Sequence, residues 1–406
     1  MKTKIFTFVN VLLLILLVQS ESFSQWHTQS FSNINNNNLR RVQFLNSLTG
    51  YACGGHGVFM KTVDGGDTWS VVNAGTPFFI SGMHFFDVST GLLGTDDSKV
   101  LKTTNGGASF TSFQLPAGSG FSSDFHFNNA NTGYLACGGN KMFKTIDGGS
   151  TWSQIADPYF SCGQIQFFNN LIGYTIVKDS LKKTFDAGVT WANVYIPGKN
   201  QAMWFHNQYT GWVTGTNFVS KTTDAGYTWV QSPLPIEVPF GIKFIDANTG
   251  WCVGFDNTKG TICKTIDGGA TWTTEKIVTG NKFYEISIIN SNKLWVSGNA
   301  LLAFTDNATS ISQTSVNTPD KFEMKQNYPN PFNPATKINF DMKKSGFASL
   351  VVYDNTGREV QTLVNENLNV GSYSVDFNAG NLTSGVYFYT LTTSDFRETK
   401  KMTLVK

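Results

Sequence analysis

The stretch that decides the fold is KTIDGGATW, which runs from Lys264 to Trp272. A turn with one acidic residue, two adjacent glycines and a closing Thr-Trp pair can either cradle a ligand or hold a hairpin together. The same pattern recurs as KTVDGGDTW (61–69), KTTNGGASF (102–110), KTIDGGSTW (144–152), KTFDAGVTW (183–191) and KTTDAGYTW (221–229). Because the copies are spaced by about forty residues, they mark a repeat architecture.

A second marker, an apolar residue followed by a Gly-aromatic or similar pair, has the same period. Its copies are Phe44…Gly50-Tyr51, Phe85…Gly91-Leu92, Phe127…Gly133-Tyr134, Phe167…Gly173-Tyr174, Phe205…Gly211-Trp212, Phe244…Gly250-Trp251 and Ile288…Leu294-Trp295. The last copy accompanies a degenerate nonapeptide, FTDNATS (304–310). Alternating apolar residues and turn residues give each unit four short strands. Four-stranded units repeated radially are propeller blades, so the sequence predicts an all-β, seven-bladed β-propeller.

The nonapeptide therefore has a structural role between the last two strands of each unit. The acid or amide is expected to accept N–H bonds from its own turn, and the aromatic residue after Thr is expected to pack beneath the hairpin. A phosphate-binding loop would instead place one glycine-rich turn before a helix. The structural residues are Asp64, Asn105, Asp147, Asp186, Asp224 and Asp267, with Trp69, Trp152, Trp191, Trp229 and Trp272.

The two ends of the predicted ring are complementary. The seventh unit lacks a Thr-Trp strand, whereas QWHTQS (25–30) follows no earlier hairpin. We predict that the segment around Trp26 supplies the outer strand of the last blade and so removes an exposed edge.

Composition and the N-terminus indicate an exported protein. Lys and Arg number 30 and Asp and Glu 28, so neither nucleic acid nor an anionic membrane is an expected partner. Residues 1–24 have the basic start, short apolar run and small-residue end of a signal peptide cleaved after Ser24. The mature chain is expected to have no transmembrane segment.

The five cysteines, Cys53, Cys137, Cys162, Cys252 and Cys263, have no metal-binding spacing. Cys252 and Cys263 flank FDNTKG, so they could form a disulfide across a hairpin. The alternative, that all five are small apolar core residues, is favoured. No cofactor is expected.

The first strand of each unit carries two polar columns on either side of an apolar position, and a strand at the inner end of a blade would direct them toward the central channel. The channel ring is expected to consist of Gln43, His84, His126, Gln166, Trp204, Lys243 and Ser287. The second column is Arg41, Gly82, Asp124, Gln164, Ala202, Gly241 and Glu285. The ring, with the loops around Phe78, Phe121, Tyr159 and Tyr284, could recognise a ligand, or it could simply be solvated.

Catalytic and metal sites have weak candidates only. Asp124 and Glu285 are the best pair of carboxylates for glycoside hydrolysis, but they fall on blades across the ring from each other. His206 is out of column with His84 and His126, so no metal site is expected.

The KTxDGGxTW pattern resembles the Asp-box, or BNR repeat. With the second marker, residues 25–315 resemble the photosystem II stability and assembly factor-like family of seven-bladed propellers. Sialidases, which also carry Asp-boxes, clamp a carboxylate with three arginines, and this propeller has only Arg40 and Arg41. Xyloglucanase-like enzymes use two propellers. The chain also lacks the arginine-rich patch of the photosystem factors, so the resemblance implies the fold rather than a photosynthetic role.

Residues 316–324 are predicted to form a linker. Five or more short strands after residue 325 predict a small Ig-like β-sandwich. Residues 325–406 closely resemble the type A C-terminal sorting domain of the type IX secretion system, through Asn327, Pro329, Pro331, Phe332, Pro334, Gly385, Tyr387, Lys400 and Lys401. The resemblance implies Sec export, passage across the outer membrane through the type IX machinery, removal of this domain by its sortase, and release of the protein or its attachment at the outer-membrane surface.

Together these patterns predict a secreted or cell-surface propeller that binds an unidentified protein or glycan without catalysis. An extracellular glycoside hydrolase and an assembly protein for another complex are the alternatives.

Overall fold

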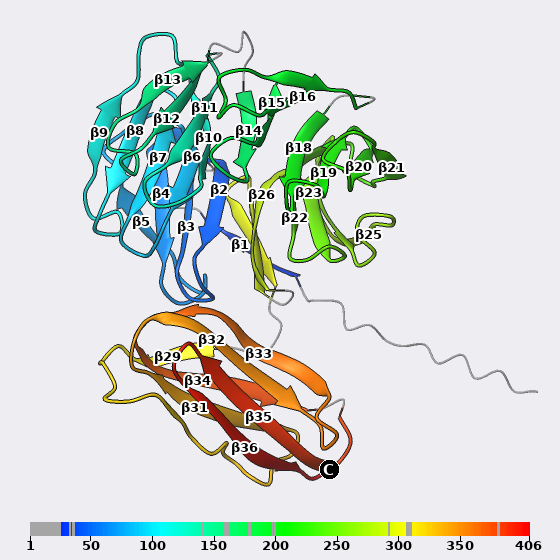
Figure 1. Cartoon of the computed structure of the whole chain (residues 1–406). Coiled ribbons are helices and arrows are strands. Elements are labelled where there is room, and N and C mark those ends of the chain that lie inside the picture. The colour runs from blue at the N-terminus through cyan, green and yellow to red at the C-terminus, as the bar shows by residue number, and fades with distance from the viewer. Residues whose placement is uncertain are drawn as a thin grey trace, which may run out of the picture.

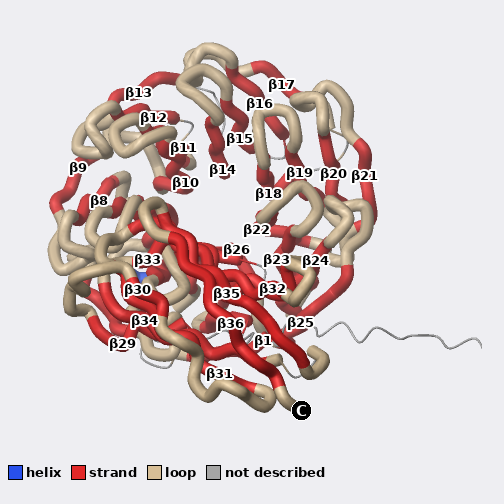
Figure 2. Tube along the Cα trace, turned by 60° about the horizontal axis from the view of Figure 1, so that its bottom comes forward, coloured by secondary structure: helices blue, strands red, loops and turns tan. Residues whose placement is uncertain are grey.

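The computed structural model describes residues 26–406 apart from 32–33, 35–36, 140, 157–161, 178–179, 197, 199, 291–292, 306–310 and 380–381. The signal peptide expected at residues 1–24 lies outside the described residues. Seven four-stranded antiparallel sheets surround a channel, and a β-sandwich lies against one end of that ring (Figures 1 and 2). The prediction of an all-β protein with a seven-bladed propeller and a C-terminal sandwich is confirmed.

The first six blades each run in chain order from the channel outward. Their strands are β2 (Leu39–Phe44), β3 (Gly50–Gly54), β4 (Val58–Thr62) and β5 (Ser70–Asn73), with the 3-10 turn η1 (Gly55–Gly57); β6 (Ile80–Phe85), β7 (Gly91–Thr95), β8 (Lys99–Thr103) and β9 (Thr111–Gln114); β10 (Ser122–Phe127), β11 (Gly133–Cys137), β12 (Met142–Thr145) and β13 (Ser153–Ala156); β14 (Cys162–Phe167), β15 (Gly173–Val177), β16 (Ser180–Thr184) and β17 (Ala192–Val194); β18 (Asn200–Phe205), β19 (Gly211–Gly215), β20 (Phe218–Thr222) and β21 (Val230–Pro233); β22 (Val238–Phe244), β23 (Gly250–Asp256), β24 (Lys259–Thr265) and β25 (Thr273–Thr279).

The seventh blade closes the ring with strands from both ends of the propeller. It contains β26 (Phe283–Asn290), β27 (Lys293–Gly298) and β28 (Leu301–Thr305), and its outer strand is β1 (Trp26–Ser30). Trp26 lies opposite Thr305 in the antiparallel pair β1–β28. The predicted closure by the N-terminal segment is therefore confirmed, while the degenerate Asp-box residue Asp306 lies outside the described residues.

The second sequence marker joins neighbouring blades. The Tyr51 ring of blade one stacks on Phe85 of blade two with centroids 3.7 Å apart, and Trp295 of blade seven stacks on Phe44 of blade one at 3.4 Å. The other face of the Phe44 ring lies over Gly50, where an added Cβ would come within 2.6 Å of the ring. Glycine is thus required beside the phenylalanine, because any side chain would displace the ring from the stack.

The Asp-box turns hold the outer two strands of each of the first six blades. Oδ1 of Asp267 accepts hydrogen bonds from the Thr265 hydroxyl at 2.8 Å and the Thr271 N–H at 2.9 Å, and Oδ2 accepts from the Thr271 hydroxyl at 2.6 Å. The Trp272 Nε1–H donates to Gly269 O at 3.2 Å. The same carboxylate bonds recur at Asp64, Asp147, Asp186 and Asp224. These carboxylates are occupied by their own turns.

Replacing Asp267 by alanine should lower the free energy of unfolding by about 1–2 kcal/mol, because the turn loses its side-chain acceptor. Replacement by asparagine should cost much less. Asn105 fills the equivalent place in blade two, where its Oδ1 accepts from the Ser109 N–H at 2.9 Å and its Nδ2 donates to the Ser109 hydroxyl. Denaturant unfolding of the full chain measures both variants, and equal losses for alanine and asparagine would show that the charge matters more than the acceptor.

Acid should weaken the propeller through these same turns. Hydrogen bonds from the Thr271 and Thr228 hydroxyls and N–H groups lower the pKa of Asp267 and of Asp224 from 3.8 to about 2. A carboxyl whose pKa is lower in the folded state stabilises it above its unfolded pKa, and that contribution is lost as the pH falls through the folded pKa. The free energy of unfolding should therefore fall between about pH 4 and pH 2. The double variant Asp224→Asn/Asp267→Asn should show a smaller decrease; an unchanged pH profile would contradict this origin.

The sandwich contains two four-stranded sheets around one apolar core. One sheet has the order β29 (Ile311–Ser315), β34 (Gly371–Asn378), β31 (Ala335–Met342) and β30 (Glu323–Met324). The other has the order β33 (Glu359–Leu368), β32 (Gly346–Tyr353), β35 (Gly385–Thr393) and β36 (Arg397–Leu404). The propeller was predicted to end at residue 315 and the sandwich to begin at residue 325, but β29 pairs with β34. Ile311 is buried in the sandwich core, so this strand belongs to the second domain.

A propeller turn docks into the sandwich. Leu48, in the turn between β2 and β3, packs against the sandwich core. The neighbouring Ser47 N–H donates to the buried carboxylate of Glu366 on β33. Ser47 is only 1% exposed, whereas the corresponding turns of the other described blades lie at the surface. The sandwich is thus anchored on blade one, beside the channel.

Candidate binding site at the channel mouth

The polar ring lines the channel, but several of its members are bonded to the next blade. Gln43 donates to Phe85 O at 2.9 Å and accepts from Phe85 N at 2.8 Å. Gln166 makes the same pair of bonds with Phe205, at 2.7 and 3.0 Å. Ser287 accepts from Phe44 N at 2.8 Å. These side chains satisfy the free edge of the adjacent innermost strand, which has no strand beside it inside the channel.

Side chains of the second polar column also accept hydrogen bonds from backbone N–H groups of the next blade's innermost strand. Asp124 Oδ2 accepts from Ile165 N at 3.0 Å, and Gln164 Oε1 accepts from Met203 N at 2.7 Å. Each innermost strand also has a bulge just before this column, as between Ser122 and Asp124. A β-bulge changes the direction of the side chain that follows it. Here the side chains that follow the bulge bond to the next blade instead of pointing freely into the channel.

Replacing Gln166 by methionine should lower the free energy of unfolding by about 1–3 kcal/mol, because both the N–H and the C=O of Phe205 lose their partner. Gln166→Glu should have an intermediate effect at neutral pH, since a carboxylate still accepts from the N–H but cannot donate to the C=O. Denaturant midpoints of the two variants test the order. A methionine variant as stable as the parent would mean that water replaces the glutamine at no cost.

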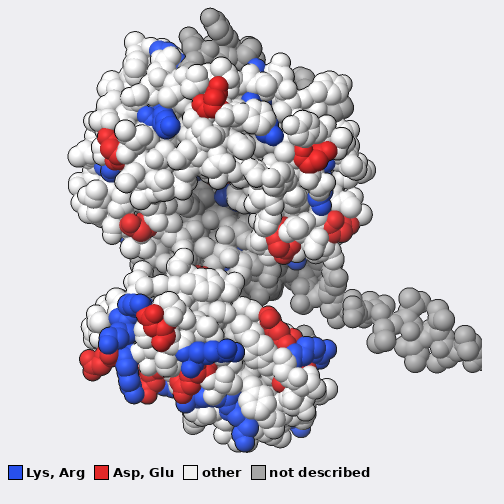
Figure 3. Space-filling view, in the orientation of Figure 1, with Lys and Arg blue, Asp and Glu red and all other residues white. Residues whose placement is uncertain are grey.

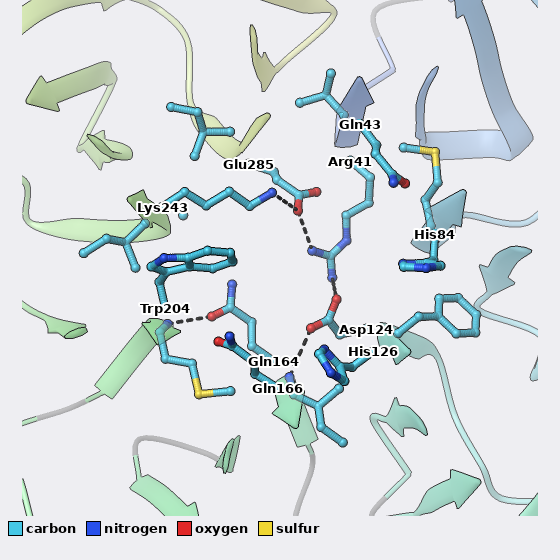
Figure 4. Close-up of a pocket in the computed structure, with 18 of the residues that line it drawn as sticks. Arg41, Gln43, His84, Asp124, His126, Gln164, Gln166, Trp204, Lys243 and Glu285 are labelled. Atoms are coloured by element: carbon cyan, nitrogen blue, oxygen red, sulfur yellow. Dashed lines mark hydrogen bonds and ion pairs between the residues drawn. The ribbon is translucent and has the colours of Figure 1, made fainter. Parts of the chain in front are cut away.

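Arg41 occupies the channel between the two candidate catalytic carboxylates (Figure 4). Its guanidinium lies 3.6 Å from Asp124 and 3.4 Å from Glu285, and its Nε donates to Ser81 O at 2.8 Å. Burial alone would lower the pKa of Arg41, but the charges of Glu285 and Asp124 outweigh it and raise that pKa. Asp124 and Glu285 thus share Arg41 as an ion-pair partner, so the two carboxylates do not face each other across an open space.

Burial disfavours the charged form of both channel histidines. Burial, followed by the charge of His126, lowers the pKa of His84 to about 4. The His84 ring stacks on Phe127 with centroids 5.0 Å apart. Burial also lowers the pKa of His126, whose Nε2 lies 3.1 Å from Asn128 Oδ1. In the part of the chain that the structure describes, no three His, Cys, Asp or Glu residues are placed to hold a metal ion.

Trp204 and Lys243 are two ring members whose polar groups are not bonded to the next blade's innermost strand. The Trp204 Nε1–H is buried and has no hydrogen-bond partner among the described residues. Lys243 Nζ lies 3.9 Å from Glu285 in a loose ion pair. A buried donor without a partner is costly, so Trp204 is a candidate to donate to a ligand.

A groove joins these two residues to the sandwich. It encloses about 630 Å³ at the channel mouth and is lined on the propeller side by Trp204, Lys243, Phe244 and Ile289. Thr362 and Asn365 of β33 form the opposite wall. Figure 3 shows a hollow in the propeller next to the sandwich, with the charged side chains of this view gathered mainly on the sandwich. Within the channel itself the cavity is about 330 Å³.

Other predicted residues lie elsewhere. Phe78 and Phe121 are exposed near the opposite mouth, where Tyr284 bonds to Asn299, and Tyr159 lies outside the described residues. Cys252 and Cys263 face each other across β23 and β24, but both are free, buried thiols in an apolar cluster. The hairpin prediction placed them correctly, and they act as core residues rather than as a disulfide.

The sorting-motif residues form a strap across the sandwich. Asn327 is buried, with its side-chain amide donating to Pro329 O and Thr336 Oγ1, and Phe332 enters the core. The Pro334 carbonyl accepts from Ala379 N at 2.8 Å. Farther along the chain, the Tyr387 hydroxyl donates to Thr383 O. Gly385 begins β35, Pro331 lies in the strap, and Lys400 and Lys401 lie on β36.

Comparisons with known proteins agree with this division. Residues 326–405 match the family of the secretion system C-terminal sorting domain. No curated protein matches the chain. A solved structure of YCF48 bound to D1 peptide superposes with a TM-score of 0.58 at 15% identity, covering 70% of this chain and 97% of that one.

Two further structures show how broadly the fold is shared. YCF48 from Cyanidioschyzon merolae has a TM-score of 0.57 at 16% identity, covering 69% of this chain and 98% of that one. Virginiamycin B lyase from Staphylococcus aureus has a TM-score of 0.59 at 10% identity, covering 70% and 99%. An enzyme and a protein solved with a peptide share this fold, so the likeness establishes the architecture alone.

The sorting domain shows that this chain is a secreted or cell-surface protein exported by type IX secretion. Its propeller has the fold of the solved YCF48 structures. Within the described residues, no helix has the length and apolar composition needed to cross a bilayer.

Proposed function

We propose that the protein is a non-catalytic binding protein that holds a protein or glycan ligand at the channel mouth, around Trp204 and Lys243. The sandwich serves as the element that the type IX machinery and its sortase engage. The observation that carries the proposal is the buried Trp204 Nε1–H without a partner, next to a groove of about 630 Å³. Ligand sites combine such apolar walls with a few placed polar groups.

The hydrogen bonds and ion pairs of the other polar residues that line the channel support binding at the mouth rather than deep in the channel. Gln43 and Gln166 are bonded to adjacent blades, and Arg41 fills the space between Asp124 and Glu285. A ligand therefore meets Trp204 and Lys243 first. A propeller of this fold has also been solved as YCF48 bound to D1 peptide, which supports a ligand of polypeptide character here.

A glycoside hydrolase is the second candidate, and one observation favours it. Burial raises the pKa of Asp124 to about 6, against the smaller opposing effects of Arg41 and the Ile165 N–H. A raised carboxyl pKa suits a general acid. The contacts of Asp124 with Arg41 and Ile165 oppose this role, because they hold the carboxyl to the protein.

One set of assays separates the two candidates. The full chain is screened against a glycan array and a peptide library, and the same glycans are tested for hydrolysis. We expect binding without turnover, weakened by Trp204→Phe, which keeps most of the ring but removes the donor. Turnover that disappears in Asp124→Asn or Glu285→Gln would overturn the binding proposal.

A further inference from the structure

The sandwich lies over one mouth of the channel. Thr362 and Asn365 of β33 form the wall of the groove that faces Trp204 and Lys243. The groove also reaches Gln43 of the polar ring, so it opens toward the channel. Figure 1 shows the sandwich against this end of the propeller, and Figure 3 shows the hollow that is left between the two domains. A ligand that approaches Trp204 from this side must therefore pass between the propeller and the sandwich.

One propeller turn holds the sandwich in this position. In the turn between β2 and β3, Leu48 packs against the sandwich core, and the Ser47 N–H donates to the carboxylate of Glu366. The equivalent turn of blade four also has a leucine two residues before the glycine that begins the second strand, and there Leu171 is 56% exposed. A leucine at this place is thus exposed unless a second surface covers it, so displacement of the sandwich would expose Leu48 beside the channel mouth.

The docked position is costly for Glu366. This residue is 7% exposed, and burial raises the pKa of its carboxyl against the opposing effects of hydrogen bonds from Ser47 and the charge of Lys293. The ionised carboxylate is therefore better solvated when the sandwich is undocked, which offsets part of the free energy gained by burying Leu48.

The chain connection compensates for this cost. β28 ends at Thr305 and β29 begins at Ile311. So short a connection keeps the sandwich at a high effective concentration beside the ring, and a weak contact then suffices to hold it docked. Once the connection is cut, that advantage is lost and the sandwich can leave.

We propose that the sandwich is a cap on the ligand site: docked through Leu48, it narrows the channel mouth, and its displacement opens the site around Trp204 and Lys243. The inference rests on the proposed function and adds the regulation of that site. The resemblance of residues 325–406 to the sorting domain implies that this domain is removed during export. The exported propeller is then expected to bind its ligand more tightly than the full chain, because the full chain binds only when its mouth is open.

Labelling of a cysteine at the mouth tests the cap in the full chain. Lys243→Cys is examined with and without Leu48→Asp, which places a carboxylate against the sandwich core. A maleimide on a bulky polyethylene glycol should react about tenfold faster when the sandwich is undocked. N-ethylmaleimide, which fits into the groove of about 630 Å³, should react at similar rates in both. Leu171→Asp is the matched control: it makes the same change in the uncovered turn of blade four and should leave the rates unchanged. The parent chain, whose described cysteines are buried, measures the background.

A second variant undocks the sandwich from its own side. Glu366→Lys replaces the acceptor of the Ser47 N–H by a cation near Lys293, and Glu366→Gln, which keeps an acceptor, is its matched control. Faster hydrogen exchange in residues 46–49 reports that the sandwich has left the turn. A peptide or glycan selected on the full chain should bind about tenfold more tightly to Leu48→Asp and to Glu366→Lys than to the parent.

The outcomes separate the cap from the proposed function. Labelling with the bulky reagent that stays slow after undocking would overturn the cap, and so would faster labelling without a gain in affinity. Weaker binding in Trp204→Phe would in either case still support the ligand site at the mouth. If neither the array nor the library yields a ligand, the proposed function fails, while the labelling rates still decide whether the sandwich closes the mouth.

Discussion

Replacing Arg41 by methionine should lower the free energy of unfolding by up to about 3 kcal/mol, because removing one partner from a fully buried ionic cluster costs about 3–5 kcal/mol and this cluster is partly exposed. The substitution leaves Asp124 and Glu285 without their shared cation and removes the bond to Ser81 O. The loss should shrink as the pH is lowered, because protonation removes the unpaired charges. Denaturant unfolding at several pH values measures both effects.

Two variants serve as controls for this cluster. Arg40 is the adjacent arginine, and its guanidinium lies 4.8 Å from the Phe240 ring centre and 5.1 Å from that of Tyr284. Arg40→Met should cost only about 1 kcal/mol through these contacts. Combining Arg41→Met with Asp124→Asn and Glu285→Gln should recover much of the loss, since both carboxylates are then neutral and Lys243, which loses Glu285, is one-third exposed to water. A single Arg41→Met variant with parental stability would show that the carboxylates are hydrated rather than paired.

Trp26→Ala should also cost about 3–5 kcal/mol, the range for deleting a large buried aromatic side chain. Trp26 is 5% exposed in the core of the last blade, and its Nε1–H donates to Glu275 Oε2 at 2.8 Å. The variant loses that packing in the one strand that joins the two ends of the ring, and it removes a donor from a nearly buried carboxylate.

Thr28→Ala on the same strand is the matched control, because Thr28 is exposed and a surface change of this kind usually costs less than about 0.5 kcal/mol. Unfolding curves of the full chain report both variants. Equal stability of the two would mean that β1 contributes little to closure.

The repeat made the fold predictable, because each unit shows the same apolar and turn residues. The sequence did not reveal why the second marker exists. The stack of Tyr51 on Phe85 joins residues of different blades, and a period identifies the unit but not the contacts between units. Closure by Trp26 was predictable for a simpler reason: one unit lacked a strand and the N-terminus offered one.

The site was less predictable. Columns of residues on the innermost strands indicated which side chains line the channel. Arg41 belongs to one of these columns, but nothing in the sequence indicated that its guanidinium pairs with both Asp124 and Glu285. Those bonds cross the ring between blades, so no local pattern encodes them. The groove depends on how the sandwich docks through Leu48, a single apolar residue in a polar turn. The strand β29 was missed because ISQTS has one buried apolar residue and otherwise resembles a linker.

The pairing of β1 with β28 also sets an order of events during synthesis and export. A chain that emerges N-terminus first presents Trp26 long before Thr305, its neighbour across the strand pair, has been made. The toroid consequently stays an open arc until nearly the whole propeller has emerged. The toroid can close before the sandwich is complete, because the sandwich begins with β29 at Ile311 but its last strand, β36, ends only at Leu404.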